Sequence, residues 1–511
     1  MLFSSSIFLG IFLPVTLAGF FAGARLGRRV AIAWLVLASL VFYGWWDPDY
    51  LLLLLPSIGF NYGAGRVLGR TTARPRLQNA VLALAIAGNL ALLFFFKYFA
   101  VLANWLAELG LGQGVEPIVL PLGISFFTFT QIGYLIDIKQ GEAEDHGPLG
   151  YALFVTFFPH LIAGPILHNR EMLPQFARPE TYRFSLENFD VGLAIFAIGL
   201  FKKTILADPL APDVHAGFDH PATLGALDAW RTLCTYSLQL YFDFSGYSDM
   251  AIGLARMFNM KFPINFDSPF KAQSVIEYWQ RWHMTLTRYL TLYVYNPLAL
   301  AIARRRATRG LKSTHGARRS WGGFLALVAV PTMTTMLVSG IWHGAGLQFL
   351  IFGLLHGAYL TANHLFRILF PLPRTAPPRP ASLTALRRVA NIAATYVAVL
   401  FALVFFRAPS FDDATTMLGG LLGLHPAAAA KPFGVQAALW LAVLYAIIWG
   451  LPNVQQLMAR WHPAIGKPRT PLWTAALGWR PAWGWALALG AMLALGFVGT
   501  DGSTDFLYFQ F

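Results

Sequence analysis

The chain has 511 residues, of which 56% are hydrophobic and only 12% are charged, and its mean hydropathy is +0.54. Soluble globular proteins carry about 25% charged residues, so this chain has too few charges to coat several soluble domains. A single cysteine, Cys234, excludes an internal disulfide framework, and the apolar content excludes a disordered protein. The composition therefore predicts a polytopic membrane protein, with one transmembrane domain over residues 1–511.

The formal net charge is +14, and the basic residues form short clusters between apolar stretches. That pattern is typical of loops kept on the cytoplasmic side of a membrane, so we do not expect nucleic-acid binding. The first positive charges, Arg25, Arg28 and Arg29, follow the first apolar run instead of preceding it. A signal peptide has the opposite order. We therefore predict a retained first span with the N-terminus outside.

A membrane helix needs about 20 mostly apolar residues, and the chain offers a series of such runs. They predict an all-α fold of about 11–13 transmembrane helices plus re-entrant or interfacial helices. The candidate spans lie near 5–23, 30–46, 50–65, 78–103, 119–138, 189–207, 230–258, 321–341, 345–366, 389–407, 434–452 and 481–499. The charge rule places the basic loops at 301–320 and 460–480 inside.

Two segments resist a simple crossing. Residues 150–167 contain Pro159, Gly164 and Pro165, which break helical hydrogen bonding. If this segment re-enters the membrane, Arg178 and Arg183 fall inside. Residues 274–300 carry several charges, which are costly at the centre of a membrane helix, so this segment favours an interfacial or protein-enclosed helix. Crossing both segments also satisfies the charge rule, and both topologies stay open.

The chain has no Walker-type loop, HExxH, CxxC or GxSxG motif, so polar residues in apolar surroundings are the best candidates for function. The first such cluster is Trp342–His343–Gly344. A neutral imidazole in a dry site can take a proton from an alcohol, and the glycines would let a substrate approach the backbone. The alternative is a hydrogen-bonded histidine in a turn between two spans.

The second cluster runs from Glu277 to Thr285. Glu277 and Arg281 are four residues apart, so they share a helix face and are expected to form an ion pair. On a continuous helix, His283 would lie about 160° round from Glu277 and so face elsewhere. The alternative is an interfacial helix anchored by Trp and Arg.

The third cluster, inside a long apolar run, comprises Asp243, Ser245, Tyr247 and Asp249. Its carboxylates need partners, and Arg256 or Arg281 is expected to supply them. No His or Cys stands at ligand spacing, so we predict a structural polar network and no metal. The remaining histidines, His160, His168, His356 and His364 among them, are expected to be satisfied polar groups.

At these clusters the sequence resembles a bacterial membrane-bound O-acyltransferase of the alginate O-acetyltransferase subgroup. The motifs that carry the resemblance follow the family order along the whole chain. They are LPLGISFFTF (120–129), FPHLIAGPI (158–166), DFSGYSDMAIG (243–253), NFDSPF (265–270), EYWQRWHMTLTRYL (277–290), SGIWHGAG (339–346), GLLHG (353–357) and FLYFQF (506–511). A family Arg-Asp pair is replaced here by Thr291–Leu292.

The resemblance implies a ring of transmembrane helices around a central tunnel. Acetyl-CoA would enter as co-substrate from the cytoplasm of a bacterial cell, with no bound cofactor. The acetyl group would leave the inner membrane toward a polysaccharide hydroxyl, directly or through a periplasmic partner acetyltransferase. His343 corresponds to the family's catalytic histidine and His283 to the second histidine of the subgroup. Trp342, Gly344, Arg281, Glu277 and the third cluster would support the tunnel.

We therefore expect His343 to act as general base on the acceptor hydroxyl, which attacks the thioester. His283 would orient a substrate or stabilise the oxyanion. An acyl-enzyme is an alternative, and the acceptor polymer stays open. Within the enzyme class, D-alanyl transfer to teichoic acid and O-acyl transfer to peptidoglycan are the alternatives. A flippase for lipid-linked sugar and a non-catalytic export scaffold are the alternatives from other classes.

Overall fold

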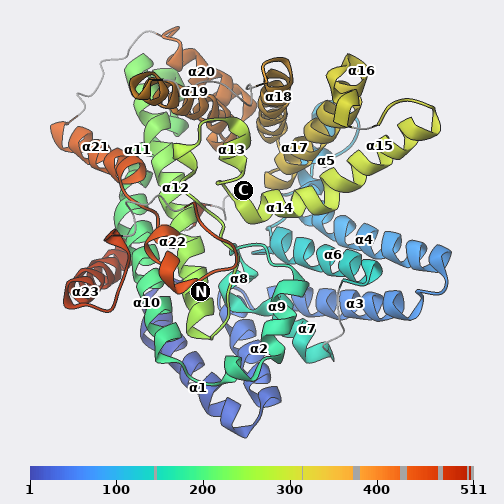
Figure 1. Cartoon of the computed structure of the whole chain (residues 1–511), viewed down its shortest axis with the longest axis vertical. Helices are drawn as coiled ribbons and strands as arrows, with labels where there is room; N and C mark the ends of the chain where they lie inside the picture. The colour runs from blue at the N-terminus through green and yellow to red at the C-terminus, as the bar shows by residue number, and fades with distance from the viewer. Residues whose placement is uncertain are drawn as a thin grey trace. The chain divides into compact units, whose positions relative to one another are not determined.

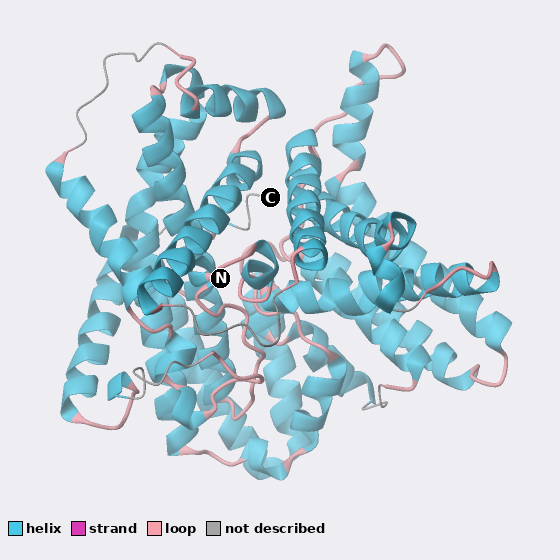
Figure 2. Ribbon diagram, turned by 45° about the horizontal axis from the view of Figure 1, so that its top comes forward, coloured by secondary structure: helices cyan, strands magenta, loops and turns pink. Residues whose placement is uncertain are grey.

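The computed structural model describes residues 1–142, 147–313, 315–371, 380–425, 434–469, 476–502 and 506–507. Within these ranges the regular structure is helical, apart from one isolated bridge between Pro263 and Ile465, which confirms the all-α prediction (Figures 1 and 2). The chain divides into two compact units, each described by itself below. Unit 1 comprises 1–208, 242–264 and 454–510, and unit 2 comprises 209–241 and 265–453. That residues 1–511 act as one domain stays a prediction.

Unit 1 is built from helices that pack in groups along the chain. Helix α1 packs against α2, α6 lies against α3 and α4, and α10 lies against α23 (Figure 1). A π-helical turn, η3 (Lys202–Ala207), extends α10. The bounds are α1 Leu13–Leu26, α2 Arg28–Gly44, α3 Tyr50–Arg70, α4 Pro75–Lys97, α5 Phe99–Glu108, α6 Ile124–Gln140, α7 Gly147–Thr156, α8 Phe158–Leu161, α9 Asn169–Ala177, α10 Leu186–Phe201, α22 Val454–Leu457 and α23 Trp483–Val498.

Unit 2 is organised around a tight pair of helices, α17 and α18, with α19 beside α18 (Figure 1). Residues 321–343 form one continuous helical run through α16, the π-helical η9 and α17. Helix α12 (Ala226–Met257) contributes its residues up to 241 to unit 2 and the rest to unit 1. The bounds are α11 Ala211–Asp219, α13 Val275–Trp279, α14 Met284–Leu290, η7 Thr291–Tyr295, α15 Asn296–Thr308, α16 Trp321–Phe324, η9 Leu325–Ala329, α17 Val330–His343, α18 Leu347–Leu369, α19 Ala381–Arg407, α20 Phe411–Leu421 and α21 Val435–Gly450.

Six helical runs of the described chain are long and apolar enough to cross a membrane, which supports a multi-pass membrane protein. They are Phe8–Leu26, Tyr50–Arg70, Pro75–Lys97, Trp321–His343, Leu347–Leu369 and Ala381–Arg407. The predicted spans 434–452 and 481–499 correspond to the shorter apolar helices α21 and α23. The predicted span near 78–103 corresponds to α4, Pro75–Lys97, but its end was placed too late, because α4 stops at Lys97 and a separate helix, α5, begins after Tyr98.

Neither of the two awkward segments is a continuous helix. Residues 147–161 form two short helices, α7 and α8, with Phe157 between them. The N–H of Phe158 donates to Ser39 Oγ at 3.1 Å. Residues 275–308 break after Trp279 and resume at Met284, then pass through a π-helical turn into α15. The helix assumed for the second cluster is therefore interrupted at His283, and the angular argument for its direction does not apply.

Candidate functional site

His343 is the last residue of α17 and lies buried among aromatic rings of unit 2. Its ring meets those of Phe352 and Phe406 edge-on, with centroids 5.8 Å and 5.0 Å away. Phe352 belongs to α18 and Phe406 to α19, so three helices enclose the imidazole. The rings around it are apolar, and an apolar setting is one in which a neutral imidazole can act as a base.

Glycines hold the end of α17 against α18. A Cβ on Gly340 would collide with the carbonyl oxygen of Phe349, and one on Gly353 would lie 2.5 Å from the carbonyl oxygen of Met336. A Cβ on Gly344 would overlap the ring of Phe349. Only residues without side chains permit this approach, which is how small residues bring membrane helices together. The glycines of SGIWHGAG and GLLHG therefore fix where the His343 turn sits.

His283 lies in the gap between α13 and α14, with a left-handed backbone (φ 42°). Its Nδ1 is 3.1 Å from Asn265 Oδ1, which also accepts from the N–H and hydroxyl of Thr285. The two Thr285 donors identify that atom as the amide oxygen, so Nδ1 of His283 must be the donor. In the neutral ring, Nε2 then carries the lone pair. Burial lowers the pKa of His283 to about 3, which keeps the ring neutral at physiological pH.

The structure brings the first and second clusters together. The rings of His283 and Trp342 lie 6.4 Å apart, and Trp342 precedes His343. The NFDSPF segment supports this arrangement, because Asn265 O accepts from the N–H of Met284 and the N–H of Asp267 donates to Arg281 O. These contacts explain why NFDSPF accompanies EYWQRWH in the sequence: the first segment shapes the turn that carries His283.

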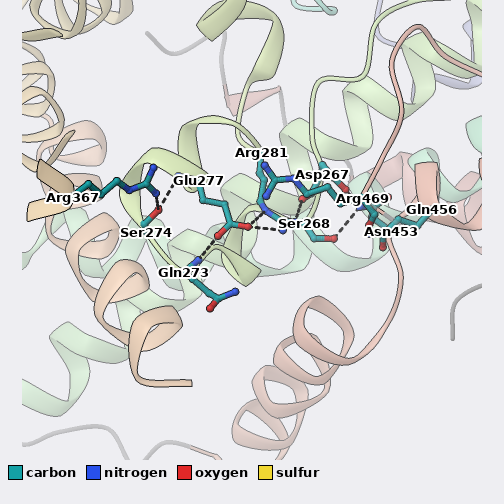
Figure 3. Close-up of polar contacts among 10 residues, drawn as sticks. All are labelled: Asp267, Ser268, Gln273, Ser274, Glu277, Arg281, Arg367, Asn453, Gln456 and Arg469. Carbon is teal, nitrogen blue, oxygen red and sulfur yellow. Dashed lines mark hydrogen bonds and ion pairs between the residues drawn. The ribbon is translucent and has the colours of Figure 1, made fainter. Parts of the chain in front are cut away.

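Glu277 and Arg281 form the predicted ion pair, with Nη2 and Nε of Arg281 at 2.7 Å and 3.0 Å from Glu277 Oε1 (Figure 3). Arg281 Nη1 also donates to Asp267 O at 2.9 Å, and Glu277 Oε2 accepts from the N–H of Gln273. All the groups in this clamp are already engaged with one another. It orients the turn before His283 instead of presenting a reactive group.

The sequence predicts only a satisfied polar group at His356, and the structure gives this side chain specific partners. The indole N–H of Trp279 donates to its Nδ1 at 3.2 Å, so the ring proton sits on Nε2. Phe352 contacts both His356 and His343, with centroids 4.7 Å and 5.8 Å away. The signal in the sequence was the GxxxG spacing of Gly353 and Gly357 around it, which marks a helix-packing face.

The third cluster belongs to unit 1, and its predicted partners are wrong. Asp249 pairs with Lys202 at 2.8 Å, whereas Lys203 Nζ lies 2.7 Å from both Asp243 and Asp208. Neither Arg256 nor Arg281 takes part in these pairs; Arg281 is engaged by Glu277. The lysines stand side by side on the π-helical turn η3, within the predicted apolar span 189–207. All five groups are buried, and burial of charge is tolerated when charges are paired.

Further contacts tie this network to segments distant in sequence. The N–H of Leu507 donates to Asp243 Oδ2 at 3.1 Å, and Gln455 Nε2 donates to Asp249 Oδ1 at 3.2 Å. The ring of Tyr247 stacks between Phe3 at 4.7 Å and Phe506 at 4.6 Å. Ser245 is buried beside them. Of FLYFQF, only Phe506 and Leu507 fall within the described residues, and they pack here.

Within the described residues, no three or more His, Cys, Asp or Glu side chains come together in a group that could hold a metal ion. The third cluster is made of Lys–Asp pairs, whose ammonium groups occupy the positions that a cation would need. His283 and His343, both of unit 2, stay the candidates for chemistry that the sequence predicts.

Comparison with known proteins gives consistent results. The model of the membrane-bound O-acyltransferase family matches residues 119–314, which include His283 and Asn265. A peptidoglycan O-acetyltransferase of Helicobacter pylori is 38% identical over 460 residues, covering 83% of this chain and 80% of that protein. A probable alginate O-acetylase of Pseudomonas aeruginosa is 36% identical over 425 residues, which cover 82% of this chain and 74% of that protein. A teichoic acid D-alanyltransferase of Streptococcus thermophilus is 26% identical over 49% of this chain.

Proposed function

The chain belongs to the membrane-bound O-acyltransferase family, and we propose that it moves an acetyl group from cytoplasmic acetyl-CoA to a hydroxyl of an extracytoplasmic polysaccharide. Members of this family are membrane acyltransferases, so the enzyme interpretation is favoured over a flippase for lipid-linked sugar and over a non-catalytic export scaffold. Acetyl as the transferred group is supported by the two long relatives, both named for O-acetylation. The D-alanyl alternative has weaker support, because its relative matches only about half of the chain.

The observation that carries the proposal is the enclosure of His343 at the close contact of α17 with α18, beside the Trp342–His283 pair. His343 takes the proton of the acceptor hydroxyl while the hydroxyl oxygen attacks the thioester carbonyl carbon. The carbon–sulfur bond then breaks, and the proton passes to the departing thiolate. The products are an O-acetyl ester and free CoA thiol. General-base help of this kind contributes about 10²–10⁴ in rate.

The geometry favours one of the two roles considered for His283. Its Nδ1–H is committed to Asn265, so Nε2 of the neutral ring carries a lone pair and has no proton to donate. A developing oxyanion is stabilised by hydrogen-bond donors. The hydroxyl group of the substrate that receives the acetyl group is itself a donor, so it needs a hydrogen-bond acceptor. His283 is therefore proposed to orient a hydroxyl group of the substrate. It is a positioning partner for His343 and not an oxyanion donor.

The polymer that accepts the acetyl group has two candidates. An alginate-like or other exopolysaccharide is supported by the alginate O-acetylases, and peptidoglycan by the relative from Helicobacter pylori. Transfer through a periplasmic partner acetyltransferase is compatible with either. Mannuronate oligomers and peptidoglycan fragments, offered separately to the same preparation, distinguish the two.

The test is free-thiol release from acetyl-CoA by the purified chain in nanodiscs, with each acceptor added. We expect release by the wild type and a fall of about 10²–10⁴ in His343→Ala. His364→Ala is the matched control, because His364 is a half-buried histidine of the same unit on α18, and it should keep its activity. Equal activity in His343→Ala, after background hydrolysis is subtracted, removes His343 from the chemistry. Absence of thiol release with every acceptor removes the proposed reaction.

We also propose residence in a bacterial inner membrane with the N-terminus outside, from the distribution of basic loops. With Cys234 replaced by Ala, single cysteines at Gln113 and Thr308 report on the two sides, since both positions are exposed. A membrane-impermeant maleimide should label the cysteine at 113 in intact cells and the cysteine at 308 only after permeabilisation. The reverse pattern inverts the topology.

A further inference from the structure

Unit 1 contains a cavity of about 550 Å³ between α10 and α23. Its walls are mostly aliphatic: Leu193 and Ala197 come from α10, and Leu489 and Leu493 from α23. A volume of about 300–1,000 Å³ is typical of sites that bind small molecules. The outer face of α23 is also apolar and exposed, with Leu487 and Val498 each 73% exposed, as expected of a helix that faces lipid.

The cavity is part of a groove between α10 and α23. The two helices converge at one end of this groove and separate at the other. Near the C-terminus of α23, a Cβ on Gly496 would lie 3.0 Å from Leu200, and one on Gly499 would lie 3.1 Å from Thr204. The cavity occupies the opposite end, between residues 190–197 of α10 and the first turns of α23. The groove therefore has a closed apolar end and an open end.

The open end carries two opposite charges and several indole rings. Asp190 and Arg480 both line the cavity there, and both side chains are exposed. No ion pair within the described chain engages either one. Trp479, Trp483 and Trp485 line the same end. Tryptophan is enriched where membrane helices meet the lipid headgroups.

The loop that carries Arg480 is held in place. The N–H of Trp479 donates to Leu457 O at 2.9 Å, and the indole of Trp461 donates to Trp479 O at 3.1 Å. The Trp461 and Trp479 rings also meet at a centroid distance of 5.3 Å. This end of the groove is thus preformed, which reduces the entropy lost when a ligand binds.

We propose that this groove binds a phospholipid with a primary ammonium headgroup, of the phosphatidylethanolamine class. Arg480 contacts the phosphate, Asp190 contacts the ammonium, and an acyl chain lies between Leu193 and Leu489. A basic residue between membrane helices on the cytoplasmic side attracts lipid phosphate. The acidic residue adds selectivity, because a glycerol headgroup offers it no cation and a choline headgroup offers it no N–H donor.

The charge rule places this end of the groove at a membrane surface. From sequence, the loop ending at Arg480 falls inside, and so does the Arg178–Arg183 segment before α10 when residues 150–167 re-enter. If α10 and α23 both enter the membrane from the cytoplasmic side, their first residues must lie at the same end of the groove. The structure agrees, because Asp190 and Arg480 both line that end. The headgroup site is therefore assigned to the cytoplasmic leaflet.

The experiment is native mass spectrometry of the detergent-purified full chain, titrated with ethanolamine, choline and glycerol phospholipids of the same acyl composition. Wild type should retain the ethanolamine lipid about fivefold better than the other two, from about 1 kcal/mol per engaged charge. Arg480→Gln should weaken all three lipids about fivefold, whereas Asp190→Asn should remove only the advantage of ethanolamine. Lys467→Gln and Glu187→Gln are exposed charge controls outside the groove and should behave as wild type.

A second pair of variants tests the groove without altering charge. Gly490 lines the cavity with open space beside it, so Gly490→Phe should fill the groove and release the lipid. Ala494→Phe, on the same helix but outside the lining, should retain it. Equal retention of the three lipids by wild type overturns the headgroup assignment. Unchanged retention in Gly490→Phe, with a monodisperse preparation, overturns the site itself.

Discussion

The indole N–H of Trp279 donates to Nδ1 of His356 at 3.2 Å, and both side chains are buried. Together with the bond from the N–H of Ile276 to Asn363 Oδ1, it joins α13, which leads into the His283 turn, to α18, which packs against the His343 helix. It also fixes the His356 tautomer with its proton on Nε2. The positions of the two proposed functional histidines thus depend on a third histidine that has no assigned chemistry.

Trp279→Phe should therefore destabilise the protein although it keeps an aromatic ring. The buried Nδ1 of His356 would lose its donor, which costs about 1–3 kcal/mol. The measurement is the thermal unfolding midpoint in detergent. Trp321→Phe is the control, because Trp321 is 67% exposed and should tolerate the change. Equal midpoints for the two variants contradict a structural role for the bond.

Asn265→Asp should change how activity depends on pH. The wild-type pKa of His283 is about 3, because burial disfavours the charged ring, so His283 does not titrate above that value. A carboxylate beside Nδ1 favours the imidazolium and raises this pKa. Protonated Nε2 can no longer accept a hydrogen bond from a substrate hydroxyl, so thiol release should fall on the acid side in the variant.

Asn265→Ala is the companion variant, because it removes the acceptor of His283 Nδ1 without adding a charge. It should lower activity at every pH and leave the shape of the profile as in the wild type. The measurement is thiol release from about pH 5 to pH 8, where neutral-pH enzymes are usually stable. Identical acid limbs for wild type and Asn265→Asp would remove His283 from the activity.

Gly340→Ala should separate α17 from α18. The new methyl group would collide with Phe349 O, and overpacking of this kind costs about 1–3 kcal/mol. Because His343 lies three residues further along the same helix, activity should fall together with the unfolding midpoint. Gly322→Ala is the matched control, since no atom lies within 4 Å of a Cβ there. A fully active Gly340→Ala would show that α17 and α18 can move apart at Gly340 without displacing His343.

Lys203→Met should be among the most damaging substitutions in unit 1. It leaves Asp208 and Asp243 buried without their ammonium partner, and breaking a buried pair in this way costs about 3–5 kcal/mol. Glu142→Gln removes one partner of the exposed Arg170–Glu142 pair and should cost about 0–1 kcal/mol. Expression level and unfolding midpoint compare the two. Similar losses would mean that the buried network is dispensable.

The fold class and the contacts of short sequence range were predictable. Glu277 and Arg281 pair as their four-residue spacing predicts, because helical geometry alone brings such residues together. The partners of Asp243 were not predictable in the same way. Lys203 lies 40 residues earlier on a π-helical turn, inside a run that reads as an apolar span. Nothing in local periodicity links the two positions.

The geometry of His283 was missed for a related reason. The segment reads as one helix, but a left-handed backbone at His283 breaks it. The side chain is held in that turn by Asn265, which lies 18 residues earlier. A positive φ is uncommon outside glycine, and the several-fold enrichment of Asn, Asp and His is too small to single out His283 among the twelve histidines of the chain. The motif NFDSPF was recognised, but its purpose required the hydrogen bonds to residues 281–285.

The contact of α17 with α18 at Gly340 and Gly353 has a consequence for the choice of acyl group. Main chain meets main chain there, so any side chain at Gly340 or Gly353 would part the two helices and move Phe352 of α18 away from His343. The side chains beside His343 that can vary are Phe352 on α18 and Phe406 on α19, with centroids 5.8 Å and 5.0 Å from that of His343. For the proposed reaction we therefore expect differences in acyl-group size to be accommodated at Phe352 and Phe406, while the paired glycines stay constant.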